Sequence, residues 1–143
     1  MDSSKTEKAT INIGIMELAQ IDLLVDSMLY TNRSDFIRIA IRDQLEKHRN
    51  DLEKLYMQSK AVNFEPHKSV YGGIGIHKIN EKDLLDAKSK NKKLHIMSMG
   101  LLIFDKKIDP KLFEDTIESI KIYGKIQASK AILDLIEKKN LKI

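Results

Sequence analysis

A six-residue segment near the start of the chain, residues 10–15, alternates polar and apolar side chains without a break. This alternation predicts a β-strand whose side chains point to opposite faces in turn. One face would carry Ile11, Ile13 and Ile15, and the other Thr10, Asn12 and Gly14. A lone strand of this length has to borrow a hydrogen-bonding partner, and the same strand of a second copy, paired antiparallel, is the obvious one. Such a two-stranded ribbon fits the major groove of DNA.

Two amphipathic helices are predicted directly after the strand. Apolar side chains recur at three- and four-residue spacing over residues 17–29 and again after Asn32. Asn32 is a favourable N-cap, with Asp35 three residues on in a capping-box-like arrangement. The second apolar pattern continues as a heptad-like seam made by Ile41, Leu45, His48, Leu52 and Leu55. We therefore extend the second helix to about residue 59 and expect the extension to pack on the partner subunit or on the next domain.

Charge and composition limit the alternatives. The chain has a net charge of +4, but residues 1–48 carry six basic against eight acidic side chains, so bulk charge does not support DNA binding by this module. Affinity has to come from where particular cations and amides lie. The absence of cysteine excludes disulfides and thiolate metal ligands. The longest apolar run, residues 96–104, is too short to span a bilayer and no export signal is visible, so we expect a cytoplasmic protein with no membrane partner.

The stretch from Thr10 to about Lys47 resembles the ribbon-helix-helix DNA-binding family, the MetJ, Arc and CopG group. The most diagnostic part is Arg33-Ser34-Asp35-Phe36-Ile37-Arg38 followed by Ala40-Ile41-Arg42. The resemblance implies a prokaryotic transcription regulator, such as a repressor, that acts as an intertwined homodimer. It also implies that the dimer lays its ribbon in the major groove and holds a phosphate at the N-terminus of the second helix.

The resemblance, carried over by position, implies a base-reading face made of Thr10, Asn12 and Gly14, with Lys8 approaching the DNA backbone. Asn12 is the best candidate for direct readout because its amide can make two hydrogen bonds to one adenine. Gly14 departs from the family pattern, which favours a long polar or basic side chain there. A solvated strand face is the alternative interpretation of these positions.

The start of the second helix is the other predicted DNA contact. Asn32, Arg33 and Ser34 would present free amides, a helix dipole and a guanidinium to a phosphate, which is compatible with a plain helix cap. We interpret Arg38 and Arg42 as a solvated helix face paired with Asp35 and Glu46, and not as DNA contacts. The dimer core implied by the resemblance consists of Ile11, Ile13, Ile15, Phe36, Ile37, Ala40 and Ile41.

The four histidines raise the alternative of a metal sensor, because nickel-responsive regulators of this family join such a module to a C-terminal sensory domain. His48, His67, His77 and His95 do not have metal-ligand spacing, since none lies two to five residues from another. We therefore predict no metal and no other cofactor. The chain also lacks a phosphate loop, a nucleophile elbow and paired histidines on a helix, so we predict no enzymatic activity.

The rest of the chain predicts a small α+β domain over residues 70–143, after a ribbon-helix-helix domain (1–59) and a linker (60–69). Strands are expected at 69–79, 94–104 and 119–128, and helices over 80–91, after Asp109-Pro110, and over 129–139. This order fits a ferredoxin-like or related small sheet. Gly75, Gly100 and Gly124 lie near the strand centres at intervals of 25 and 24 residues, which either a degenerate strand-plus-helix repeat or coincidence explains.

These patterns together predict a sequence-specific DNA-binding transcriptional regulator whose partners are double-stranded DNA and further copies of the chain. The C-terminal domain would form a tetramer or higher oligomer, or sense a ligand. One alternative is an antitoxin-type autorepressor whose C-terminal part binds a toxin, although such tails are usually disordered until bound and this one is patterned through to Lys139. Another is a structural protein that organises DNA by assembling through its C-terminal domain.

Overall fold

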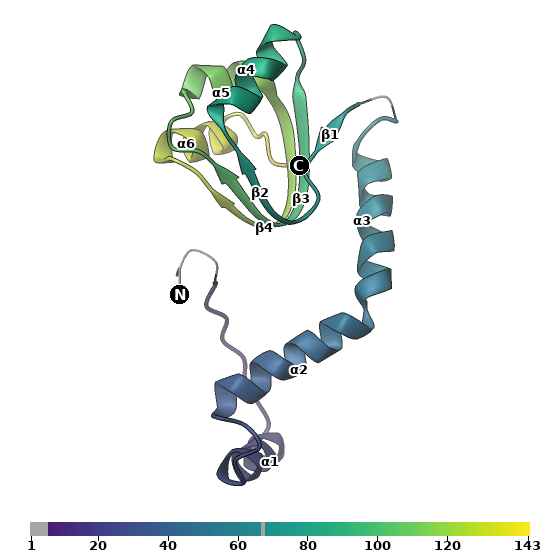
Figure 1. The fold of residues 1–143 in the computed structure, drawn as a ribbon, viewed down its shortest axis with the longest axis vertical. Helices are drawn as coiled ribbons and strands as arrows, with labels where there is room; N and C mark the ends of the chain where they lie inside the picture. Colours follow the sequence, from purple (N-terminus) through teal and green to yellow (C-terminus); the bar gives the residue numbers. More distant parts are fainter. Residues whose placement is uncertain (1–5, 67) are drawn as a thin grey trace. The chain divides into compact units, whose positions relative to one another are not determined.

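A computed structural model of the chain describes residues 6–66 and 68–143, and Figure 1 gives the order of its helices and strands. The chain divides into two compact units, Met1–Leu55 and Tyr56–Ile143. Both helices and a four-stranded sheet are present, so the α+β class is confirmed. Within the described residues, no helix is long and apolar enough to cross a membrane.

The first unit contains α1 (Ile15–Asp26) and α2 (Arg33–Lys47), preceded by an irregular segment. Residues 6–14 have no regular secondary structure in the single chain, and Ile15, predicted as the last residue of a strand, is the first residue of α1. The strand prediction is therefore wrong at Ile15. Gly14 is the N-cap of α1, and its carbonyl accepts a hydrogen bond from the Leu18 N–H at 2.9 Å. Residues 10–14 have no partner strand in one chain, so their pairing stays a prediction.

The turn between α1 and α2 is fixed by local hydrogen bonds. The helix α1 ends at Asp26, earlier than predicted, because Met28 adopts a left-handed conformation with φ 60°. The Leu29 N–H then donates to the Leu24 carbonyl at 3.1 Å, which closes the C-terminus of α1. Asn32 caps α2 as predicted, since its side chain accepts from the Asp35 N–H at 2.9 Å.

The long second helix predicted to residue 59 is in fact two helices. The helix α2 ends at Lys47, His48 has φ −102° and ψ 11°, and α3 (Arg49–Asn63) follows at once. The His48 carbonyl accepts the Leu52 N–H at 2.8 Å, so His48 serves both as the end of one helix and as the start of the next. The prediction of one continuous helix is wrong. The heptad-like spacing of apolar residues continues past His48, but the backbone leaves the helical conformation there.

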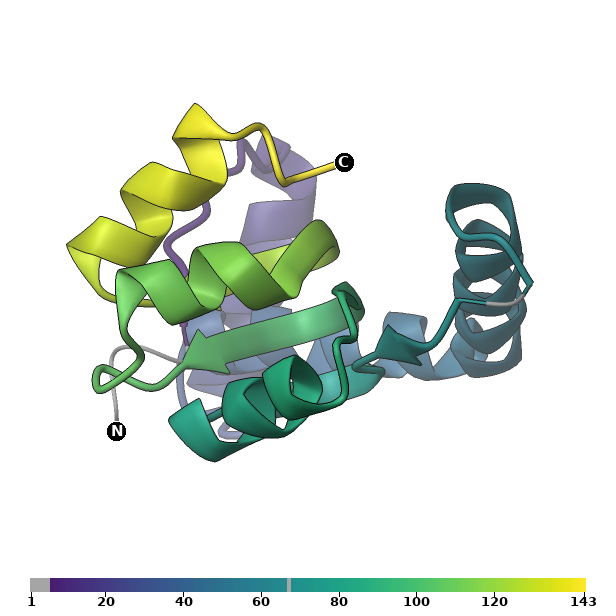
Figure 2. The same ribbon diagram turned by 90° about the horizontal axis from the view of Figure 1, so that it is seen from above.

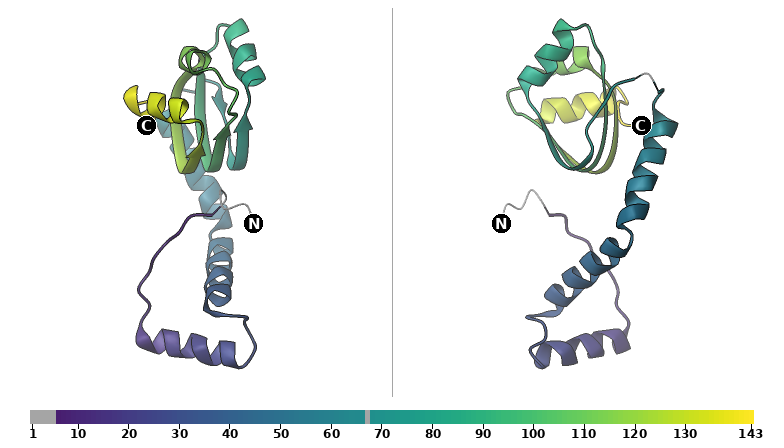
Figure 3. Two further views of the ribbon diagram at one scale, coloured as in Figure 1. Left: turned by 90° about the vertical axis from the view of Figure 1, so that its left-hand side faces the viewer. Right: turned by 45° about the vertical axis from the view of Figure 1, so that its right-hand side comes forward.

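The second unit contains a parallel sheet made of β1 (Val70–Tyr71), β2 (Ile74–Ile79), β3 (Leu94–Phe104) and β4 (Ile117–Gln127). The central strand is β3, with β1 and β2 along one side and β4 along the other (Figure 3). The strands β1 and β2 keep one register against β3 and are separated only by Gly72 and Gly73. They form the single edge strand predicted for residues 69–79, interrupted once.

Each of β2, β3 and β4 is followed by a helix, and the three helices lie in succession on one face of the sheet (Figure 2). They are α4 (Glu81–Ser89), α5 (Pro110–Thr116) and α6 (Lys130–Lys138). Their boundaries agree with the predicted helices because each begins at a side-chain N-cap: Asn80, Asp109 and Ser129. The ferredoxin-like arrangement is wrong, since that fold has an antiparallel sheet and all strand pairs here are parallel.

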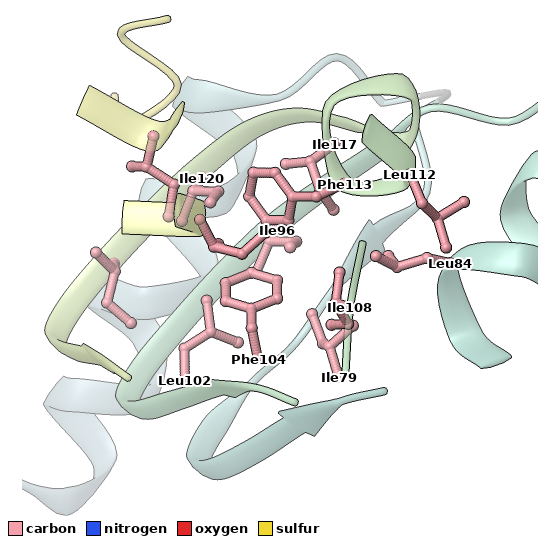
Figure 4. Packing of buried hydrophobic residues seen from close by; sticks show 13 residues of the cluster. Ile79, Leu84, Ile96, Leu102, Phe104, Ile108, Leu112, Phe113, Ile117 and Ile120 are labelled. Carbon is pink, nitrogen blue, oxygen red and sulfur yellow. The ribbon is translucent and has the colours of Figure 1, made fainter. Parts of the chain in front are cut away.

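The hydrophobic core lies between the sheet and these helices (Figure 4). Phe104 of β3 and Phe113 of α5 meet edge to face with ring centroids 5.1 Å apart, and both are almost fully buried. The core is completed by Ile79, Leu84, Ile96, Leu102, Ile108, Leu112, Ile117, Ile120, Ile122, Ile132 and Ile136. The second unit therefore has its own core within one chain.

The three glycines noted in the sequence are direct neighbours across the sheet. Gly75 pairs with Gly100, and Gly100 pairs with Gly124. All three have a positive φ, 123°, 137° and 127°, a region that residues with a side chain rarely adopt. A Cβ on Gly100 would overlap the carbonyl oxygen of Gly75, and one on Gly124 would overlap that of Gly100. Their spacing therefore reflects a strand-plus-helix repeat.

The end of α3 packs against this sheet, and α3 extends to Asn63, within the predicted linker. The Tyr56 hydroxyl donates to the Met97 carbonyl at 2.8 Å, and Ser59 lies 2.9 Å from the Tyr123 hydroxyl. Phe64, buried beyond the end of α3, contacts the ring of His95. Burial lowers the pKa of His95, whose Nδ1 lies 2.8 Å from the Ser119 hydroxyl.

Candidate nucleic-acid interface

The segment predicted to form the ribbon is open to solvent. Lys8, Thr10, Asn12 and Gly14 are all exposed. Within the described part of the chain, the backbone groups of residues 8–13 have no hydrogen-bond partner. Exposed backbone donors and acceptors in an extended segment are what a second strand needs for pairing. Gly14 differs from the other three, because its place at the start of α1 makes it part of the helix cap.

The N-terminus of α2 is capped by two side chains. Asn32 accepts the Asp35 N–H at 2.9 Å, and the Asp35 carboxylate accepts the Thr31 N–H at 3.1 Å. The N–H groups of Arg33 and Ser34, the first two residues of α2, have no acceptor among the described residues. Unsatisfied amides at the positive end of a helix dipole are suited to binding a phosphate oxygen. The predicted amides of Arg33 and Ser34 are therefore available.

The Arg33 side chain binds Asp22 in the single chain, and its contact with a phosphate stays a prediction. Its Nε and Nη2 donate to the two carboxylate oxygens of Asp22 at 2.6 and 2.7 Å. This hydrogen-bonded pair lowers the pKa of Asp22 and raises that of Arg33. The guanidinium assigned to a phosphate thus joins α2 to α1. Sequence reasoning missed Asp22 because the two residues are eleven positions apart on different helices.

The ion pairs expected along α2 are not formed. Arg38 and Arg42 were expected to pair with Asp35 and Glu46, but Asp35 caps the helix and Glu46 binds Arg49 at 2.6 Å. Arg38 and Arg42 are exposed and have no ion-pair partner in the described residues. The expectation was wrong because the capping role of Asp35 and the turn at His48, which brings Arg49 to Glu46, both override simple helical spacing.

The first unit leaves most of its apolar side chains uncovered. Ile21 is the only one of its described apolar residues that is buried. Of the predicted dimer core, Ile15 is 87% exposed, Ile11 64% and Ile41 53%; Ile13, Phe36 and Ile37 are half-buried, and Ala40 is exposed. Further large apolar residues of this unit that are exposed are Met16, Leu23, Met28, Leu29, Leu45 and Leu55. A surface this apolar is typical of a protein–protein interface.

The three histidines that the structure describes, His48, His77 and His95, do not form a metal-binding group. No group of three potential ligands drawn from His, Asp and Glu lies together within residues 6–66 and 68–143. His48 lies near Asp51, with Nδ1 3.4 Å from a carboxylate oxygen, and His95 pairs with Ser119 in the second unit. His67, the remaining candidate of the metal-sensor interpretation besides His77, lies outside the described residues, as do residues 1–5.

Comparison with known protein families identifies the class. Residues 4–133 match the model of the Ribbon-Helix-Helix transcriptional regulator family, and the chain belongs to that family. This confirms the resemblance found in the sequence, and members of this regulator family are typically non-enzymatic. The match continues through the parallel sheet into α6, so it covers more than the predicted DNA-binding module. No curated protein and no solved structure matches the chain.

Proposed function

We propose that the chain is a sequence-specific transcriptional regulator that binds DNA as a homodimer through a two-stranded antiparallel ribbon. Residues 10–14 of two copies pair with each other, and the ribbon enters the major groove. Asn12 and Thr10 read base edges there. Lys8 and the free amides of Arg33 and Ser34 contact phosphates on either side of the groove.

The observation that carries this proposal is the uncovered apolar surface of the first unit. Ile21 is the single buried apolar residue among the described residues of this unit, and such a core is too small to hold two helices on its own. Pairing two copies covers Ile11, Ile13 and Ile41 and supplies the missing strand partner for residues 10–14. The match to the Ribbon-Helix-Helix transcriptional regulator family spans residues 4–133, which include this unit, and it supports the proposal.

A toxin-masking tail fits the second unit less well. Residues 70–143 form a sheet covered by three helices, with a core that includes Phe104, Phe113 and Ile120. A segment that folds only on its toxin has too few buried apolar residues to fold alone. The folded second unit therefore supports a regulator with a structured C-terminal domain.

Selection of binding sites from a random double-stranded library by the purified full chain tests the proposal. A two-fold symmetric dimer is expected to enrich two related half-sites in a fixed spacing. Raising the salt concentration should weaken binding to every sequence, because phosphate contacts release counterions. Enrichment of no sequence, or of a single half-site without a symmetric mate, would refute the ribbon dimer.

A further inference from the structure

One edge of the parallel sheet, along β2, is open. Ile74 and Ile76 are 52% and 58% exposed although β2 belongs to a sheet with a full core. The neighbour of β2 on one side is β3, and no described strand lies on the other. An exposed apolar edge strand is a site where another strand can be added.

The backbone groups along this edge are oriented outward in a regular way. The carbonyls of Gly73 and Ile79 accept hydrogen bonds from β3 and from Asp105, on the inner side. Because backbone groups alternate in direction along a strand, the N–H and C=O groups of Ile74, Ile76 and Lys78 point away from β3. These groups have no partner among the described residues.

At Gly75 no atom of the described chain covers this edge. A Cβ added to Gly100 or Gly124 would point at a glycine carbonyl of the preceding strand. Gly75 has a similar φ, but a Cβ added to it would have no atom within 4 Å. At Gly75 the edge of β2 therefore leaves open the space that a neighbouring strand fills at Gly100 and Gly124.

The other edge of the sheet, along β4, is not free in the same way. Ile120 accepts from the Ile143 N–H at 2.9 Å and donates to the Leu141 carbonyl at 2.7 Å. Tyr71 of β1 pairs with Ile96 of β3, and Ile96 pairs with Ile120 of β4. If a second copy added to β4 by its β1–β2 edge in this same register, its β1 would therefore lie beside Ile120. Residues 141–143 of the same chain already lie beside Ile120. They therefore obstruct the addition of further copies along β4.

We propose that β2 pairs antiparallel with β2 of a second copy about a two-fold axis at Ile76. In this register Ile76 faces Ile76 of the partner subunit, and Ile74 faces Lys78 of the partner subunit. All the outward backbone groups of Ile74, Ile76 and Lys78 then find partners. The two Lys78 charges stay apart, and the exposed isoleucine side chains meet on one face of a continuous sheet.

The partner strand on the β2 edge comes from a second copy of the same chain. The pairing rests on the proposed function in one respect: the ribbon dimer keeps two C-terminal units in one particle at high effective concentration. Pairing within one dimer or between two dimers on DNA uses the same edge, because a two-fold contact is self-complementary. The C-terminal unit is thus assigned as a second, symmetric dimer contact.

Single-cysteine cross-linking in the full chain tests this register, because the natural sequence has no cysteine. Facing residues of a hydrogen-bonded antiparallel pair have Cα atoms about 5.5 Å apart, within the range of a disulfide. With oxidised glutathione, Ile76→Cys is expected to form covalent dimers about tenfold faster than Leu85→Cys, a control on α4 with matched exposure of 51%. Ile74→Cys alone should not cross-link, since the two copies of this residue lie roughly 14 Å apart along the strands.

A mixture of Ile74→Cys and Lys78→Cys chains provides a second readout if Ile76→Cys folds poorly. These variants should cross-link to each other and not to themselves. Equal rates for Ile76→Cys and Leu85→Cys, or self-cross-linking of Ile74→Cys, would overturn the proposed pairing. Loss of DNA site selection with the cross-links intact would instead count against the ribbon dimer, so the two failures are distinguishable.

Discussion

Arg33 at the start of α2 and Asp22 in α1 form a two-pronged ion pair, with N···O distances of 2.6 and 2.7 Å. Both side chains are about half exposed, so salt screens the pair and its contribution to stability is modest. Its geometric role is larger, because it holds the N-terminus of α2 against α1. In the proposed complex, the phosphate at this end of α2 is bound by the amides of Arg33 and Ser34, while the guanidinium positions the helix.

The pH dependence of unfolding should reveal this pair. The hydrogen bond from Arg33 lowers the pKa of Asp22 below its ordinary value of 3.8. Since the folded pKa is the lower one, the pair stabilises the fold above the ordinary pKa and stops doing so as the pH falls through the folded value. Asp22→Asn should therefore be less stable than the natural chain by a constant amount between about pH 5 and 7, with the gap closing in more acid solution. Urea unfolding at several pH values measures it, and a gap that widens on acidification would contradict the pair.

The glycine row in the sheet predicts an uneven cost of adding a methyl group. Gly100→Ala should lower the free energy of unfolding by at least about 2 kcal/mol, because it combines an unfavourable positive φ with overlap of the Gly75 carbonyl. Gly73→Ala is the matched control, since a Cβ there meets only the movable His77 ring, at 3.3 Å. Denaturant unfolding of both variants gives the comparison. Equal losses would mean that the close approach of the two strands is not a constraint.

Local signals were sufficient to predict much of this fold. Asn32, Asn80, Asp109-Pro110 and Ser129 predicted where helices begin, because an N-cap depends only on residues a few positions away. Strand order and direction were not predictable in the same way, since parallel pairing is decided by contacts between residues far apart in sequence. The intervals of 25 and 24 residues between the glycines are consistent with parallel neighbouring strands. Only the pairing of Gly75 with Gly100 and of Gly100 with Gly124 in the structure showed this.

The candidate site was predictable in part for a related reason. Asn32 and the amides at the start of α2 follow from a local cap, and the structure has them as expected. The Asp22–Arg33 pair depends on how two helices meet, and the turn at His48 has no glycine or proline to mark it. Residues 10–14 have no regular secondary structure in one chain, so no property of one chain decides whether they pair as proposed.

The uncovered surface of the first unit predicts that its oligomeric state is sensitive to charge at the proposed interface. Ile41→Glu should shift the full chain toward species with fewer subunits and reduce its helix content, because a carboxylate at a buried dimer position is costly to desolvate. Leu85→Glu makes the same change at a residue of almost equal exposure in the single chain, 51% against 53%, and should leave both properties unchanged. Sedimentation equilibrium and circular dichroism measure the two effects. Similar behaviour of both variants would place Ile41 outside the interface.

The most direct test of the regulator proposal measures readout by one side chain. On a binding site selected by the natural chain, Asn12→Ala should lose about 1 to 3 kcal/mol of binding free energy and relax sequence preference at one base position of each half-site. Asn50→Ala, which changes another exposed asparagine in α3, serves as the control and should bind as the natural chain does. Unchanged affinity and unchanged base preference for Asn12→Ala would contradict the claim that the ribbon reads DNA.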